Sequence, residues 1–195
     1  MGTTFDISKT QKNPGKIWFG LAVPAALSYL TIGADGTPDA VQNPNARLIG
    51  LTDQGSTIGL TKSFTEEFYD EFKYPLERNM DQVGATIKCS AAQVLDADLL
   101  TLTTVGMGTP LTPVGKLAWT LGESDLTFTS IAVIAPTKAD STKFVVFHLY
   151  KAYNKAPFEM PISRQTRAAL ALEFEAVAIP TRAKGDTVGA LWIST

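Results

Sequence analysis

The feature of this chain that most limits how it can fold is a pair of long alternating segments between Arg47 and Ala92. In both segments apolar and polar side chains alternate with period two, the pattern of a strand that buries one face and exposes the other. The apolar parity consists of Ile58, Leu60, Phe64, Phe68 and Phe72 in the first segment, and of Val83, Ala85, Ile87, Cys89 and Ala91 in the second. We therefore predict one long β-hairpin over residues 56–92, connected by an acidic and aromatic loop at residues 69–79.

Both predicted strands run for about a dozen residues, about twice the usual strand length. Strands of that length overhang a domain of this size, and an unpaired strand edge is prone to aggregation. Pairing with the same hairpin of a neighbouring copy, head to tail, would cover the edges and close a ring. The connecting loop is also too apolar for a free tip, so we predict that it docks on another subunit. Its candidate inter-subunit residues are Tyr69, Phe72, Tyr74, Pro75 and Leu76.

The rest of the chain is punctuated by Gly and Pro at short intervals, which favours short strands over helices. Further strands are predicted over Ile17–Ala22, Leu27–Ile32, Arg47–Thr52, Lys116–Leu121, Leu126–Ala135, Phe144–Tyr153, Arg167–Ile179 and Val188–Ile193. Ser90 and Gln93 have the spacing of a helix capping box, and leucines follow at helical spacing, so one helix is predicted over residues 91–105. We predict one mainly β domain over residues 1–195, a β-sandwich or partly closed barrel, with residues 1–16 as a polar arm.

Composition and charge argue against several classes of function. The net charge of −2 gives no overall attraction to nucleic acid or to an anionic membrane. Cys89 is the only cysteine and lies on the apolar parity, which predicts a buried and inert thiol. His148 is the only histidine and lies in an apolar strand, so we predict a hydrogen-bonded or interfacial histidine, not a catalytic one. We therefore predict no catalytic residue, no metal and no cofactor, and a protein that is not an enzyme.

Four other patterns are weak as functional signals. The pair Gly106 and Gly108 follows the predicted helix, whereas a dinucleotide-binding loop precedes one. The apolar run at residues 17–34 is short for a membrane span and contains Pro24, so we predict two strands and no membrane partner. A secretory signal peptide is the alternative, because lysines precede the short apolar core. The acidic group Glu66, Glu67, Asp70 and Glu71 is predicted to be a solvated face. The only local basic enrichment is Arg164, Arg167, Arg182 and Lys184.

In its organisation, the chain resembles the tail tube (major tail) proteins of long-tailed bacteriophages, especially the non-contractile kind. The resemblance begins in ARLIGLTDQGSTIGLT, at residues 46–61, and continues through the turn FKYPL at residues 72–76 into the returning strand with its helix. It extends through FTSIAVIAPT, FVVFHLYKAY and ALALEFEAVAIPTR, which is followed by Gly185, Asp186 and Thr187. These motifs cover nearly the whole chain in the expected order, but they are patterns of strand and turn. Residues 1–45 match least.

The resemblance implies a virion protein that forms six-fold rings, assembled in the host bacterial cytoplasm. The rings would stack into a tube that conducts DNA, with tape-measure, tail-terminator and tail-tip proteins as partners. Ile58, Leu60, Phe64, Phe68, Ile87 and Cys89 would face the subunit core, and the loop, the N-terminal arm and the tail after Thr181 would carry ring-to-ring contacts. The lumen would be lined by Thr61, Ser63, Thr65, Glu67, Thr86 and Lys88.

A lumen with carboxylates and hydroxyls would repel phosphate and let duplex DNA slide. Lys88 fits such a lining only if Glu67, or another acid on a paired strand, neutralises it. Two other readings stay open at this point. One is a tube like that of type VI secretion, which would deliver effectors. The other is a ligand-binding β-sandwich, which is expected to cluster exposed aromatic side chains with amides, whereas Trp18, Trp119 and Trp192 lie within apolar strand patterns.

Overall fold

A computed structural model describes residues 15–26, 28–49, 52–67, 77–91, 110–111, 118–119, 126–137, 140, 142–157, 159 and 169–194. This part of the chain is mainly β and contains no helix. The strands are β1 (Lys16–Phe19), β2 (Arg47–Leu48), β3 (Thr52–Glu67), β4 (Glu77–Ala91), β5 (Pro110–Leu111), β6 (Ala118–Trp119), β7 (Thr129–Pro136), β8 (Phe144–Asn154), β9 (Leu170–Ala176) and β10 (Gly189–Ile193).

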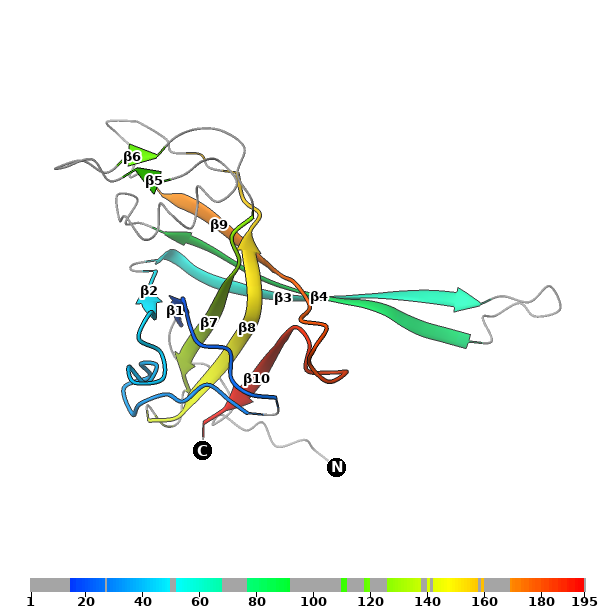
Figure 1. Ribbon diagram of the computed structural model, residues 1–195, viewed down its shortest axis with the longest axis horizontal. Helices are drawn as coiled ribbons and strands as arrows, with labels where there is room; N and C mark the ends of the chain where they lie inside the picture. Colours follow the sequence, from blue (N-terminus) through cyan, green and yellow to red (C-terminus); the bar gives the residue numbers. More distant parts are fainter. Residues whose placement is uncertain are drawn as a thin grey trace, which may run out of the picture.

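Eight of these strands form one antiparallel sheet, with the order β2-β1-β7-β8-β9-β4-β3 and with β10 paired to β8 (Figure 1). β8 organises the sheet, because β7 lies along one of its edges while two strands share the other. β10 pairs with residues 145–149 of β8, and β9 pairs with residues 152–154. The short strands β5 and β6 pair with each other in a separate two-stranded sheet.

The connection between β2 and β3 shows that the sheet is strongly curved. β2 ends at Leu48 and β3 begins at Thr52, so the chain can cover at most about 14 Å between them. In a flat sheet of this order, six inter-strand spacings of about 4.8 Å would place β2 and β3 about 29 Å apart. The sheet must therefore curl until its first and last strands approach each other. No pairing between β2 and β3 exists in the described residues, so the curled sheet is open.

Two hydrophobic clusters lie on opposite faces of the central strands. The larger one lines the inner face, and its largest fully buried side chains are Phe174, Ile17, Ile87, Ile131, Leu149, Leu170 and Leu172. The smaller cluster lies on the other face, where Leu21 and Leu30 from the segment 20–46 pack against Ile134 and Phe144. Gly36 makes this cover possible, since its φ is 75° and a Cβ there would lie 2.5 Å from the Phe144 ring.

The mainly β class and the long hairpin predicted from sequence are confirmed, with β3 and β4 in antiparallel register. The strand predicted over Leu27–Ile32 is wrong, because its described residues, 28–32, are irregular chain in which Ile32 alone makes an isolated bridge, with Pro38. Ala91, the first residue of the helix predicted over residues 91–105, is instead the last residue of β4, and residues 92–105 lie outside the described residues. The predicted arm at residues 1–16 also lies outside them as far as residue 14. Among the described residues, no helix has the length and hydropathy to cross a membrane.

Candidate assembly surface

The outer part of the β3–β4 hairpin projects beyond the rest of the sheet (Figure 1). β4 pairs with β9 only from Thr86 to Ala91, and β3 pairs with β4 alone. Residues 60–67 of β3 and 77–85 of β4 therefore form an arm of two strands, which extends about 30 Å at the usual rise per residue. In the described part of the chain, nothing pairs with the outer backbone edge of either strand of the arm. The predicted overhang is thus confirmed.

One face of the hairpin is apolar: part of it belongs to the inner core, and the rest extends beyond the core and is exposed. Ile87 and Ala85 of β4 are buried, whereas Ile58 and Leu60, directly opposite them on β3, are 41% and 58% exposed. Val83, farther along the arm, is 39% exposed. The prediction that Ile58 and Leu60 face the subunit core is therefore wrong, because β3 is the last strand of the sheet and lacks cover on that side. Ile87 is buried as predicted, whereas Phe64 and Phe68 lie outside the described side chains.

Cys89 lies on the same face of β4 as Ile87 and packs partly buried against the core. Burial raises the pKa of its thiol to about 12, so the reactive thiolate is scarce at neutral pH. The predicted burial of this thiol is therefore met only in part, since Cys89 is partly buried. The raised pKa supports the prediction that the thiol is inert.

The opposite face of the hairpin is polar and low in relief. Thr61 lies opposite Gly84, and Thr86 lies opposite Gly59. A Cβ on either glycine would come within 2.6 Å of the facing threonine hydroxyl, so each threonine lies over a glycine. Of the predicted lumen-lining residues, four lie on this face: Thr61, Ser63, Thr86 and Lys88. The side chains of Thr65 and Glu67 are outside the description, as are the predicted inter-subunit residues Tyr69, Phe72, Tyr74, Pro75 and Leu76.

Two ion pairs cross this polar face, one between β4 and β9 and the other between β9 and the residue that follows β8. Lys88 Nζ lies 3.0 Å from Glu173 Oε1, and Lys155 Nζ lies 2.9 Å from Glu175 Oε2. The Tyr153 hydroxyl also donates a hydrogen bond to Glu175 Oε2 at 3.1 Å. The hydrogen bond from Lys155 lowers the pKa of the Glu175 carboxyl and raises that of Lys155 itself.

The prediction that Lys88 needs an acid on a paired strand is met by Glu173, which lies opposite Lys88 in the β4–β9 register. The sequence places Glu173 and Glu175 on the polar parity of β9, but it does not reveal which lysines they face. The acidic lining stays a prediction, because Glu67, the carboxylate among the predicted lumen-lining residues, lies outside the described side chains. Glu173 and Glu175, which lie on the described part of this face, are each paired with a lysine.

His148 is fully buried on the outer face of β8. Its Nε2 lies 2.6 Å from Ser130 Oγ, and that hydroxyl lies 3.3 Å from the carbonyl oxygen of Leu149. In the Nε2–H tautomer the ring donates to Ser130, whose hydroxyl donates to Leu149 O, and both donors are satisfied. The prediction of a hydrogen-bonded histidine is confirmed. Ser130 and His148 have the spacing of a nucleophile and its base, but they are 5% and 0% exposed, so no substrate reaches this pair.

The pH dependence of folding should report on this histidine. Burial, with a smaller contribution from the Arg182 charge, lowers the pKa of His148 from 6.5 to about 4. Between these two pH values the unfolded chain binds a proton that the folded chain does not, so stability falls as the pH falls. The loss should reach about 3 kcal/mol at pH 4 and vanish above pH 6.5.

Urea unfolding of the wild type and of His148→Phe at pH 7.5, 5.5 and 4.5 measures this effect. The phenyl ring keeps most of the packing and cannot titrate, so the stability of the variant should fall less steeply between pH 6.5 and 4. Parallel slopes for the two proteins would contradict the assignment.

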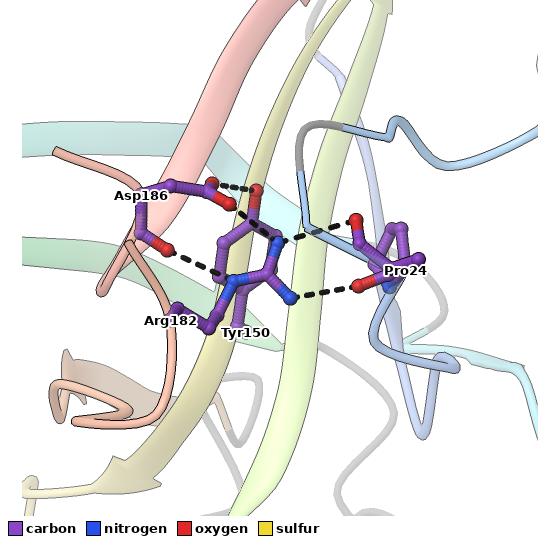
Figure 2. Close-up of polar contacts among 5 residues, drawn as sticks. Pro24, Tyr150, Arg182 and Asp186 are labelled. Atoms are coloured by element: carbon purple, nitrogen blue, oxygen red, sulfur yellow. Dashed lines mark hydrogen bonds and ion pairs between the residues drawn. The ribbon is translucent and has the colours of Figure 1, made fainter. Parts of the chain in front are cut away.

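Arg182 connects the loop between β9 and β10 to two other parts of the fold (Figure 2). Its guanidinium stacks on the Tyr150 ring at 4.1 Å and donates to Asp186 Oδ2 at 2.7 Å and to Pro24 O at 2.7 Å. The Tyr150 hydroxyl donates to Asp186 Oδ1 at 2.9 Å, and burial together with this bond raises the pKa of Tyr150 to about 12.

Because the Arg182 and Asp186 side chains are only 9% and 14% exposed, this pair is an internal clamp. Arg182 and Asp186 thus engage each other within the subunit, and β10 beyond them pairs with β8 of the same chain. The ring-to-ring contacts predicted for the tail after Thr181 stay a prediction.

Within the described residues, no three His, Cys, Asp or Glu side chains gather as metal ligands would. Comparison with known proteins found no matching family model and no significantly similar curated protein. Within the described residues, the arm combines unpaired outer backbone edges, an exposed apolar face and a polar face of small side chains.

Proposed function

We propose that this chain is the subunit of a bacteriophage tail tube, a structural virion protein that assembles into stacked rings. The observation that carries the proposal is the arm: two long strands whose outer backbone edges have no partner among the described residues, and whose apolar side chains Leu60 and Val83 extend beyond the core and are exposed. An edge of that length exposes a row of free amide and carbonyl groups, which natural proteins pair or cover. A second copy of the chain supplies such a partner.

We infer head-to-tail pairing, because the two open edges of the arm belong to different strands, β3 and β4. If β3 of one copy pairs with β4 of the next, the contact joins two different surfaces, and such contacts generate rings or filaments. In the ring, Leu60 and Val83 would be buried against the neighbour. The six-fold number comes from the resemblance to tail tube proteins.

The flat polar face would then line the channel. Thr61 and Thr86 place small hydroxyls over glycines, and Lys88 is held by Glu173. Among the described side chains of β3 and β4, no aromatic ring lies on this face for bases to stack on. A duplex can pass over such a surface without binding. The partners would be tape-measure, tail-terminator and tail-tip proteins, with assembly in the host cytoplasm.

Assembly of the purified full-length chain tests this proposal. Sedimentation velocity and negative-stain microscopy over a range of protein concentrations should show rings or tubes of uniform width. Urea-dissociated protein returned to buffer should reassemble into the same particles. A chain that stays monomeric at high concentration, with tail-tip initiator proteins supplied, would count decisively against the proposal.

A further inference from the structure

The polar face carries more lysines than we expect of a channel surface over which DNA passes without binding. Lys88 lies on β4, Lys151 lies near the end of β8, and Lys155 directly follows that strand. Lys151 Nζ sits 4.2 Å above the Phe128 ring. Lysines that follow neighbouring strands of one face are the usual contacts for phosphates. Without acidic neighbours, this region would attract a polyanion.

Glu173 and Glu175 are placed where they cancel that attraction. β9 lies between β4 and β8, and the two glutamates alternate with the buried Leu172 and Phe174, so both carboxylates emerge between the lysines. Each carboxylate forms an ion pair with one lysine, at 3.0 Å and 2.9 Å. The ammonium groups are therefore engaged across the strands.

Stability alone does not account for these two pairs. The lysine side chains are more than half exposed and their partners about a third exposed. Ion pairs in that setting contribute little to folding, because water screens the attraction and two long side chains lose freedom. The two glutamates do, however, lower the positive charge of this face.

We propose that Glu173 and Glu175 prevent this face from binding duplex DNA by occupying the ammonium groups of Lys88 and Lys155. The role of that property in DNA passage rests on the proposed function, whereas the electrostatic effect belongs to the subunit itself. Glu173→Gln/Glu175→Gln keeps the shape of both side chains and removes both negative charges.

Fluorescence anisotropy of a labelled duplex, with the free subunit as titrant, measures the effect. Asp35→Asn/Asp140→Asn is the matched control, since it changes the net charge equally at two exposed turn carboxylates. Wild type and control should bind no DNA at about 50 mM salt, whereas the Gln variant should bind. Two phosphate contacts predict an affinity that falls about tenfold between about 50 and 200 mM salt. Adding Lys88→Gln and Lys155→Gln should abolish the binding.

Three results would overturn the inference: no binding by the Gln variant, equal binding by the matched control, or binding that survives loss of both lysines. None of them depends on assembly. If the wild type forms tubes but the Gln variant does not bind DNA, only this inference fails. If the Gln variant binds DNA but no condition yields rings, only the proposed tube function fails.

Discussion

Arg182→Ala should lower the free energy of unfolding by about 3–5 kcal/mol, the usual effect of removing one partner of a buried ion pair. The substitution leaves the Asp186 carboxylate nearly buried without its guanidinium, and it removes the donors to Asp186 O and Pro24 O. The cation that stacks on Tyr150 is lost as well. Three segments that are far apart in sequence would lose their common contact.

Urea unfolding followed by far-ultraviolet circular dichroism at pH 7.5 measures the change. Lys88→Gln is the matched comparison, because it breaks the ion pair with Glu173 on the exposed face and should change stability by less than about 1 kcal/mol. Arg182→Lys keeps the charge but not the planar fork of donors, so it should recover only part of the loss. Equal effects for Arg182→Ala and Lys88→Gln would contradict the clamp assignment.

Alternation along the chain was enough to predict the hairpin, because a period of two specifies which side chains share a face. It was not enough to predict burial along the whole hairpin. Ile58 and Ile87 lie on the same face and opposite each other, yet only Ile87 is covered by the core. The length of hairpin that the core covers depends on where β9 pairs with β4. That pairing joins residues far apart in the sequence, so no local pattern predicts it.

The contacts that define the polar face and the clamp could not be predicted for a related reason. Lys88 and Glu173 meet through the β4–β9 register, and Arg182 reaches Pro24 across 158 residues of chain. Each of these residues looks like ordinary surface charge in the sequence. The strand predicted over Leu27–Ile32 is wrong for a different reason. Its apolar residues Leu30 and Ile32 pack on the outer face of the sheet without forming a strand.

Leu60→Asp should abolish ring formation and leave the folded subunit nearly as stable as the wild type. The side chain is already 58% exposed in the single subunit, so replacing it should change the free energy of unfolding by about 0.5 kcal/mol or less. In a ring, the same carboxylate would be buried against a neighbouring copy without a partner. That burial costs several kcal/mol per interface, enough to raise the concentration needed for assembly about a hundredfold or more.

Val41→Asp is the matched control, because Val41 is 90% exposed in the loop between β1 and β2 and is not part of the arm. Both variants introduce one carboxylate at an exposed apolar position, so a general effect of charge would appear in both. Sedimentation velocity should show rings for wild type and Val41→Asp, and monomers for Leu60→Asp, while urea unfolding shows similar stability for all three. Rings formed by Leu60→Asp at the wild-type concentration would mean that the apolar face of the arm does not pack against a neighbour.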